Sequence, residues 1–404
     1  MKNSLTFQEA RELLLAETRP MGAETVCLAE AAGRVLAQNI PAGGDVPPFD
    51  ASPYDGYAFR AEDSAGATGE TPVTLRVLEE IPAGSTAKYP IIPGTAARIM
   101  TGAPIPDGAD AVVMYEKTEF TRETVKLFAP AKCGENIIRA GEDVKAGTVL
   151  AEPGDVIDAG TLGTVASQGL EELSVHRIPR VGIISTGSEL TEPGQTGGPG
   201  KIFNSNRYTF TALLRGAGCA PVYLGTAGDE AGAITALIRK GLAGCDAVLL
   251  TGGVSVGDYD LTPDAVVAAG GRILFREVGI KPGMACCYGV KDEKLILGLS
   301  GNPASAVTSF HAVAAPALRK LCGRKDCLPR EVTLTLAGGF SKKSPVTRLL
   351  RGRMDVSDGT ARFVMPKDQG NVVLSSTIGC DVIAVVPAGS GPIAPGSRLK
   401  GFLL

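Results

Sequence analysis

The alternation of short apolar runs with helical segments between about Arg180 and Gly323 constrains the fold more than any other feature of the chain. Strand-like and helix-like segments follow one another at 181–185, 206–215, 221–225, 229–242, 246–251, 262–269, 272–276 and 295–299. This rhythm predicts a parallel sheet whose strands are joined by crossover helices. We therefore expect a doubly wound α/β domain in which ligands bind beyond the carboxyl ends of the strands.

The segments on either side of this region have a different pattern of strand-like and helix-like residues. From about Pro41 to Val144, short β-like runs alternate with Gly and Pro, which predicts a small β-rich domain. The last ~80 residues again contain short strand-like runs, and this pattern predicts a small β-barrel. At the N-terminus, Thr6 and Glu9 form a capping box that begins a helix. Further helices are expected at 28–38 and 155–170, and a connector at 174–179.

Composition argues against several classes of partner. The 404 residues carry a formal net charge of −3 and contain no block of Lys or Arg, so nucleic acid and anionic membranes are not expected to bind. Aromatic residues make up only 5% of the chain and tryptophan is absent. Stacking on aromatic side chains is therefore not expected as a general binding strategy.

Cysteine usage and hydropathy indicate a reduced, cytoplasmic environment. The nine cysteines are scattered and no CxxC pair occurs, which fits free thiols and excludes the usual zinc spacing. Only two histidines are present, so a histidine-based metal site is not expected either. No signal peptide is visible, and no run reaches the ~18 apolar residues that span a bilayer.

A glycine-rich motif follows one predicted strand and reads Thr251-Gly252-Gly253-Val254-Ser255-Val256-Gly257-Asp258-Tyr259-Asp260. Glycines let backbone N–H groups approach an anion, and Thr251 and Ser255 can donate to phosphate oxygens. Asp258 and Asp260 then lie beside this pocket, where a divalent cation could join them to a phosphate. A tight strand-to-helix turn is the structural alternative, and the added serine and acids favour a functional loop.

Two other strand ends carry weaker signals. Asn302 and Pro303, which follow the 295–299 run, are typical of the start of a helix, whose free N–H groups form an anion site. Thr186-Gly187-Ser188-Glu189 follows the 181–185 run and offers hydroxyls and a carboxylate. Taken alone, the Asn302 motif is explained equally well by the beginning of a helix, and Glu189 is explained better as an acid at a helix start than as a catalytic group.

Polar turns elsewhere add single candidates. Lys281 precedes Pro-Gly and offers a fixed positive charge to an anion, although an exposed lysine on a type II turn is the alternative. Asp55 lies in a long, irregular, acid-bearing segment before the β-rich region. Thr101 and Asp143 occupy similar polar turns at the ends of predicted strands.

Taken together, these motifs resemble the molybdopterin molybdenumtransferase family, which also includes the E domain of gephyrin. The matching strings occur in the family's order from about Ala29 to the end of the α/β segment. They are PPFDASPYDGYA, RIMTGAPIPDGADAVV, RAGEDV, VGIISTGSEL, IFNSNRYTFTALL, LLTGGVSVGDYD, GIKPG and GLSGNPASA. The C-terminal segment resembles the family only in its β texture.

The resemblance implies a fold and an activity. It implies an elongated helical domain at 1–46 and 145–178, a β-rich domain at 47–144, a molybdopterin-binding α/β domain at 179–326 and a C-terminal β-barrel at 327–404. Family members are homodimers that bind adenylylated molybdopterin and molybdate, hydrolyse the adenylate, place molybdenum on the dithiolene sulfurs and release AMP. They require a divalent metal, usually Mg²⁺, and the pterin adenylyltransferase is an expected partner.

The resemblance also carries roles onto individual positions. The implied catalytic residues are Asp55, Thr101, Asp143, Glu189, Asp229, Asp260 and Lys281, of which the first three come from across the dimer. The implied metal ligands are Glu189, Asp229, Asp258 and Asp260. The residues expected to bind the pterin substrate are Thr186, Gly187, Gly252, Gly253, Ser255, Gly301, Asn302, Pro303 and Ser305.

One departure from the family pattern and two rival functions accompany this hypothesis. Many members carry a second lysine after the Pro-Gly pair, where this chain has Met284. A molybdopterin adenylyltransferase shares the α/β domain but lacks the flanking domains, so the length of this chain argues against it. A non-catalytic dimeric scaffold is the other alternative, and nothing in the sequence adds a partner domain for that role.

Overall fold

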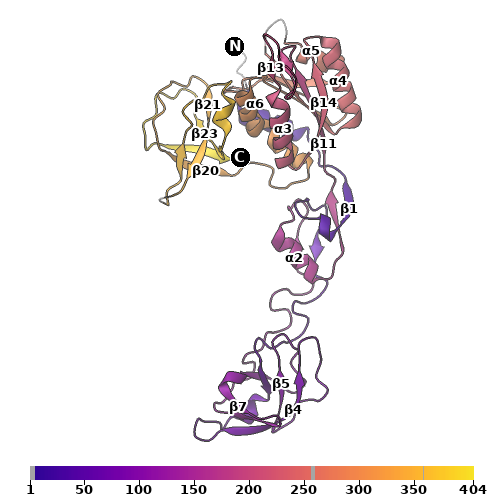
Figure 1. The fold of residues 1–404 in the computed structure, drawn as a ribbon, viewed down its shortest axis with the longest axis vertical. Coiled ribbons are helices and arrows are strands. Elements are labelled where there is room, and N and C mark those ends of the chain that lie inside the picture. The colour runs from indigo at the N-terminus through magenta and orange to yellow at the C-terminus, as the bar shows by residue number, and fades with distance from the viewer. Residues whose placement is uncertain (1–4, 256–259, 358) are drawn as a thin grey trace. The chain divides into compact units, whose positions relative to one another are not determined.

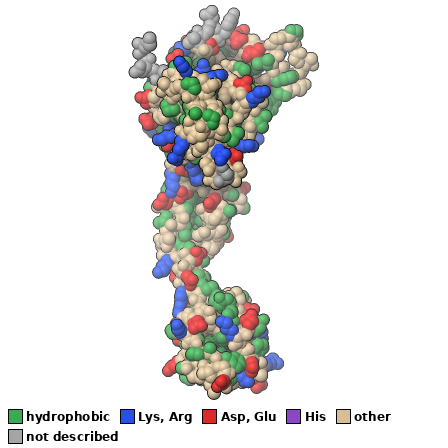
Figure 2. All heavy atoms as spheres, turned by 90° about the vertical axis from the view of Figure 1, so that its left-hand side faces the viewer, with side chains coloured by type: hydrophobic (Ala, Val, Ile, Leu, Met, Phe, Trp, Pro, Cys, Tyr) green, Lys and Arg blue, Asp and Glu red, His purple; other side chains and the backbone are tan. Residues whose placement is uncertain are grey.

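The computed structural model describes residues 5–255, 260–357 and 359–404 and divides into two compact units. Unit 1 contains 1–38, 153–158 and 172–404, and unit 2 contains 39–152 and 159–171. On the face shown in Figure 2, acidic and basic side chains are interspersed over the surface, in keeping with the low net charge. Within the described ranges, no helix combines the length and the apolar character needed to cross a bilayer.

Unit 1 is built on a six-stranded sheet with the order β14-β11-β15-β19-β18-β16. Strand β18 runs antiparallel to both of its neighbours, and the other strands are parallel to one another. The strands are β11 (Arg180–Thr186), β14 (Ala220–Ala227), β15 (Ala247–Thr251), β16 (Arg272–Glu277), β18 (Ala285–Lys291) and β19 (Lys294–Leu299). The predicted parallel α/β sheet is therefore confirmed, and β18 is an additional strand that the sequence pattern did not predict.

Helices cover both faces of this sheet because successive strand residues point to opposite sides. On one face, Phe210 of α3 (Ser205–Gly216) packs with Leu249 of β15 and with Phe310. On the other, Ile238 of α4 (Ala231–Gly244) and Val266 of α5 (Thr262–Ala268) pack with Val248 and Leu250. Figure 1 shows α3 and α6 on one side of β11 and β14, with α4 and α5 on the other.

The long helix expected after Asn302 is interrupted. It consists of α6 (Pro303–Ser309), a π-helical turn at Phe310–Ala314 and α7 (Ala315–Leu321), all in one continuous segment. Asn302 precedes Pro303 at the first helical position, as the sequence predicts.

The C-terminal strands of unit 1 close into a five-stranded barrel in the order β21-β22-β20-β24-β23, with β23 paired back to β21. Their bounds are β20 (Glu331–Leu336), β21 (Thr347–Asp355), β22 (Arg362–Val364), β23 (Val382–Val386) and β24 (Arg398–Leu403). Leu334, Leu350 and Phe363 fill its interior. A short strand of the α/β region, β17 (Ile280–Lys281), pairs with β21 and joins the barrel to the sheet domain.

Unit 2 contains a second six-stranded sheet with the order β6-β3-β5-β4-β8-β7, which confirms the expected β-rich region. Its strands are β3 (Gly56–Phe59), β4 (Val73–Ile81), β5 (Thr95–Ile99), β6 (Ala111–Met114), β7 (Thr118–Phe120) and β8 (Thr124–Leu127). Tyr57, Phe59 and Leu75 lie in its core. Helix α2 (Ala159–Ser167) and the strand pair β2 (Ile40–Pro41) and β9 (Val149–Ala151) complete the unit.

The N-terminal capping box is confirmed. Glu9 N–H donates to Thr6 Oγ1 at 3.2 Å, Thr6 N–H donates to the Glu9 carboxylate at 2.8 Å, and α1 (Phe7–Ala16) follows. Two other expectations are wrong. The segment 28–38 forms only a 3₁₀ turn at Leu28–Glu30, because Gly33 adopts a φ of 76° and later backbone groups bond to distant segments.

The expected connector at 174–179 begins as a strand instead. Strand β10 (Glu172–His176) pairs with β1 (Ala23–Cys27), and this pairing satisfies backbone groups that the sequence pattern assigned to a loop. The segments expected to form a helical domain therefore contain strand pairs as well as α1 and α2. The sequence analysis divides the chain into four domains, whereas the structure is divided into two units, so the four domain boundaries stay a prediction.

Asp246 anchors the beginning of β15. Its carboxylate accepts hydrogen bonds from the Arg177 guanidinium at 2.7 and 2.9 Å and from Arg180 N–H at 2.7 Å. Burial by itself raises the pKa of Asp246, but these hydrogen bonds outweigh burial and hold the pKa below its ordinary value. The ionised carboxylate is therefore the form that stabilises the fold.

Replacing Asp246 with asparagine is expected to lower the free energy of unfolding by about 1–3 kcal/mol at neutral pH, because charge-assisted bonds are lost. A carboxyl group with a depressed folded-state pKa stabilises above its unfolded pKa of about 3.9, and this contribution disappears as pH falls through the folded value. Denaturant unfolding at pH 7 and below about pH 4 tests this expectation. A difference between the two proteins that persists undiminished in acid would contradict it.

Candidate functional site

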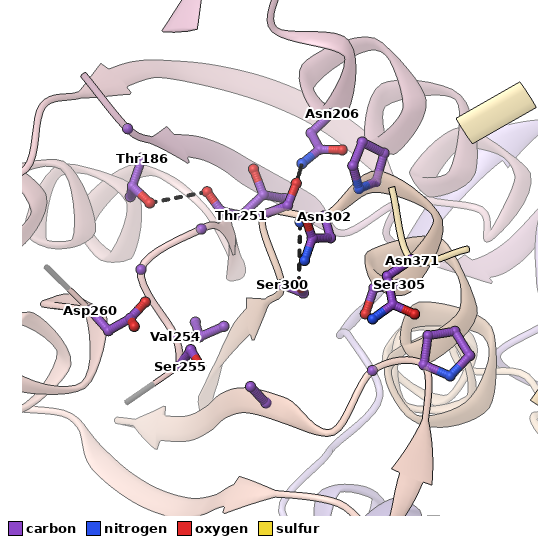
Figure 3. Close-up of a pocket in the computed structure, with 18 of the residues that line it drawn as sticks. Thr186, Asn206, Thr251, Val254, Ser255, Asp260, Ser300, Asn302, Ser305 and Asn371 are labelled. Carbon is purple, nitrogen blue, oxygen red and sulfur yellow. Dashed lines mark hydrogen bonds between the residues drawn. The ribbon is translucent and has the colours of Figure 1, made fainter. Parts of the chain in front are cut away.

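A cleft of about 1370 Å³ opens at the carboxyl ends of β11, β15 and β19, and all of its lining residues belong to unit 1. The parallel register places Ser185 beside Thr251 and Thr251 beside Leu299, so the loops that follow these strands lie at one edge of the sheet. Figure 3 shows polar side chains from these loops facing the same space. The position agrees with the rule for ligand sites in open α/β sheets.

The loop after β11 is held by a reciprocal pair of hydrogen bonds. Ser188 N–H donates to the Asp229 carboxylate at 3.1 Å, and Asp229 N–H donates to Ser188 Oγ at 3.2 Å. Gly187 adopts a φ of 137°, and a Cβ there would lie 2.3 Å from the Glu189 carboxylate. The glycine therefore leaves room for Glu189 at the edge of the cleft.

The two glycines after β15 are both required by the backbone. Gly252 has a φ of 101°, and a Cβ on it would lie 2.5 Å from Thr186 Oγ1 and 2.7 Å from the Thr186 carbonyl oxygen. Gly253 has a φ of 64°, and its Cβ would lie 2.9 Å from Thr262 Oγ1. These glycines bring the β11 and β15 ends into contact, where Thr186 Oγ1 donates to the Thr251 carbonyl at 3.2 Å (Figure 3).

The loop after β19 is fixed from two sides. Asn206 Nδ2 donates to the Gly301 carbonyl at 2.9 Å, and Asn302 N–H donates to Ser300 Oγ at 3.2 Å (Figure 3). Ser305 N–H donates to the Asn371 carbonyl at 3.1 Å, so a loop of the barrel forms part of the cleft wall. The segment that the sequence assigned to anion binding thus lies in the cleft with a defined conformation.

Charged groups in the cleft are predominantly acidic. The described lining residues include the carboxylates Glu189, Asp229, Asp260 and Glu277 against the two cations Arg276 and Lys281. Asp258, the remaining predicted metal ligand, lies outside the described residues. Within the described ranges, no three His, Cys, Asp or Glu side chains converge closely enough to hold a metal ion by themselves.

The three site residues predicted outside the α/β region all lie in unit 2. Asp55 Oδ1 accepts from both Thr101 N–H and Thr101 Oγ1 at 2.8 Å, and these hydrogen bonds hold the pKa of Asp55 below its ordinary value. Both side chains are exposed. Asp143 is also exposed and donates its N–H to the Val46 carbonyl at 3.0 Å. Asp55 and Thr101 therefore form an acidic turn that faces solvent.

Several cleft residues were not predicted from the sequence. Asn206 and Asn371 fix the loop after β19 from other elements, and their spacing in the sequence gives no sign of that contact. Ile202 and Phe203 line the cleft from a two-residue strand, β13, which pairs with β12 (Leu190–Thr191). The sequence signal for this strand was the pair of apolar residues directly before Asn204, the residue that caps the following helix.

Comparison with protein-family models gives two matches. Residues 5–169 match the MoeA N-terminal region, described as domains I and II. Residues 182–320 match a probable molybdopterin binding domain. The second match contains most of β11, all of β15 and β19, and the loops that follow these three strands.

Similar proteins cover almost the whole chain. A molybdopterin molybdenumtransferase of Staphylococcus aureus (strain Mu50) is 36% identical over 391 residues, covering 96% of this chain and 93% of the relative. A protein of the same name from Staphylococcus epidermidis is 38% identical over 352 residues, covering 87% of this chain and 84% of that relative.

A solved structure supports the same assignment. The molybdopterin biosynthesis moeA protein from Pyrococcus horikoshii OT3 has a TM-score of 0.85 and 31% identity, with complete coverage of both chains. The fold of the whole chain, including the β-rich segment and the barrel, is therefore shared with that protein. The chain belongs to the molybdopterin molybdenumtransferase family and is a transferase of molybdenum cofactor biosynthesis.

Proposed function

We propose that the chain inserts molybdenum into adenylylated molybdopterin, hydrolysing the adenylate and releasing AMP. The observation that carries this proposal is the placement of Glu189, Asp229 and Asp260 in one cleft with the glycine-lined loop at Gly252 and Gly253. Cleavage of a phosphoanhydride develops negative charge on the leaving phosphate, and backbone N–H groups and cations stabilise such charge. The cleft offers both kinds of group.

The loops after β15 and β19 supply the proposed contacts to the pterin phosphate. Gly252 and Gly253 keep the loop after β15 free of side chains, Ser255 and Ser305 offer hydroxyl donors, and Asn302 offers a side-chain amide. The proposed substrate-binding set also contains Thr186, Gly187, Gly301 and Pro303, which all line the same cleft. Lys281 is proposed to meet the oxyanion of molybdate or phosphate, because its exposed ammonium group lies in the cleft wall.

A divalent cation fits the excess of carboxylates. Four carboxylates against two cations among the described lining residues would repel a polyanionic substrate unless a metal ion lay between them. Mg²⁺ prefers oxygen ligands, retains several waters and is commonly held by one or two carboxylates together with substrate phosphates. We propose that Glu189, Asp229, Asp258 and Asp260 hold Mg²⁺, which would neutralise phosphate charge during adenylate hydrolysis.

We further propose that the enzyme is a cytoplasmic homodimer in which Asp55, Thr101 and Asp143 serve the cleft of the partner subunit. The support is the exposed acidic turn at Asp55 and Thr101, together with the family membership. All nine cysteines are free, which is consistent with a reducing compartment. A pterin adenylyltransferase is the proposed supplier of the substrate, since it would produce the adenylylated form.

The experiment that tests the proposal separates the two reactions that a molybdopterin-binding α/β domain could support. Purified protein receives either ATP with molybdopterin, or adenylylated molybdopterin with molybdate and Mg²⁺. We expect AMP formation only from the second mixture. Consumption of ATP with formation of adenylylated pterin would identify an adenylyltransferase instead and would overturn the proposal.

A further inference from the structure

One aromatic side chain that lines the cleft is largely exposed to solvent. Phe203 lines the cleft and is 56% exposed, and no ring stacking or cation–π contact engages it within the described part of the chain. Phe275, the other aromatic side chain among the described lining residues, is buried and stacks on Tyr288 with ring centroids 4.9 Å apart. Phe203 alone therefore presents a free aromatic face to a ligand there.

The neighbouring residue extends this apolar surface. Ile202 is 57% exposed and also lines the cleft, and both residues belong to β13 (Ile202–Phe203). Water contact with two large apolar side chains is unfavourable, and covering them would stabilise the protein in proportion to the area removed from solvent. Because the pair lines the same cleft as the glycine loop at Gly252 and Gly253, a ligand bound there would cover it.

The backbone that carries Phe203 is anchored on both sides. Before it, Lys201 Nζ donates to the Ser188 carbonyl at 2.5 Å and Ile202 N–H donates to the Glu189 carbonyl at 2.9 Å. After it, the buried Asn204 side chain exchanges hydrogen bonds with Ser185 Oγ at 3.0 and 3.2 Å. The backbone of Phe203 is thus anchored in the pairing of β12 with β13, opposite Thr191.

Asn204 is itself held by an ionic network. Its Nδ2 donates to Glu192 at 3.0 Å, and the Arg207 guanidinium donates to the same carboxylate at 2.7 Å. Arg207 also lies over the Tyr223 ring at 3.9 Å. Arg207 thus engages the rings of Tyr208 and Tyr223, whereas Phe203 has no such partner in the described structure.

We propose that Phe203 is the stacking platform for a planar fused aminopyrimidine ring of the substrate, with Ile202 covering its edge. This inference rests on the proposed function, because the substrate of that reaction contains two such rings, the pterin and the adenine. An aromatic face next to phosphate-binding loops suits a ligand that joins a flat heterocycle to a phosphate. A stacked base contributes enough to weaken binding roughly 10-fold when the aromatic ring is removed.

Calorimetric titration with three probes distinguishes the two rings. AMP, neopterin and inorganic phosphate are titrated into the wild type and into Phe203→Ala, Phe203→Tyr and Tyr208→Ala. Tyr208 is a matched control, since it is exposed and close in sequence but does not line the cleft. We expect Phe203→Ala to weaken AMP or neopterin binding about 10-fold, with Phe203→Tyr and Tyr208→Ala close to wild type and phosphate unaffected.

A selective loss of AMP binding assigns the adenine to Phe203, and a selective loss of neopterin binding assigns the pterin. Unchanged binding of both, or an equal loss of phosphate binding, would overturn the proposal. If the fragments bind the wild type too weakly to measure, turnover decides: Phe203→Ala should raise KM about 10-fold with little change in kcat, and an unchanged KM would refute stacking. Fragment binding does not require turnover, so failure of the proposed reaction remains distinguishable from failure of this inference.

Discussion

Substitution of Gly252 by alanine is expected to reduce molybdate-dependent AMP release at least about 100-fold. The new Cβ would lie 2.5 Å from Thr186 Oγ1 and 2.7 Å from the Thr186 carbonyl oxygen, which is shorter than real contacts allow. The φ of 101° also disfavours any residue with a side chain. The loop after β15 must therefore move away from β11, and the phosphate contacts that we propose for this loop are lost.

Gly216→Ala provides the matched control. Gly216 ends α3 in the same unit, and a Cβ there meets no atom within 4 Å. The control should retain wild-type activity and stability. Circular dichroism and thermal unfolding should show that Gly252→Ala remains folded, with a stability loss of about 1–3 kcal/mol from the strained backbone. A folded Gly252→Ala enzyme with wild-type turnover would show that this loop does not bind the phosphate.

Asp260→Asn and Asp55→Asn should each abolish molybdate-dependent AMP release, whereas a mixture of the two variants should recover roughly a quarter of wild-type activity. Asp260 lines the cleft and Asp55 lies in the exposed turn of unit 2. If each cleft uses Asp55 from the partner subunit, random exchange makes half of the dimers mixed. In each mixed dimer one of the two clefts has both native acids, so a quarter of all clefts are active. Asparagine preserves size while removing the charge that the proposed metal site and catalysis require.

The measurement uses co-expressed subunits with different affinity tags, so that mixed dimers can be isolated. The isolated mixed dimers should have about half of the wild-type activity, and the unseparated mixture about a quarter. Each single variant must elute as a dimer and unfold like the wild type. Asp63→Asn serves as a matched control, since Asp63 lies in the same unit and accepts a hydrogen bond from Gly94 N–H at 3.0 Å, away from the Asp55 turn. Inactive mixed dimers would contradict the sharing of a cleft between subunits, and full activity of either variant alone would remove that residue from the site.

The α/β core could be predicted because its sequence signals are local. Apolar runs such as 181–185 and 246–251 became buried strands, and the helical segments between them became α3, α4 and α5. Strand β18 (Ala285–Lys291) has no clear alternation, and its pairing with β19 decided its conformation. Strand β24 (Arg398–Leu403) was missed for the same reason, because barrel closure depends on partners that are distant in sequence.

The site was predictable where glycine or hydroxyl residues directly follow a strand. Gly187, Gly252 and Gly253 were identified in this way, and all three line the cleft. Phe203 and Asn371 were missed, since each reaches the cleft from an element that the local pattern does not connect with it. The low aromatic content of 5% predicts only that stacking is not a general device, and it gives no information about a single ring in one position.

The most direct test of the account is AMP release by the purified protein from adenylylated molybdopterin, with molybdate and Mg²⁺ omitted one at a time. The acidic cleft predicts rapid release only when both are present, because the metal ion offsets carboxylate repulsion and molybdate completes the reaction. Release that proceeds equally well without molybdate, or that survives chelation of all divalent metal, would contradict molybdenum insertion as the reaction of this cleft.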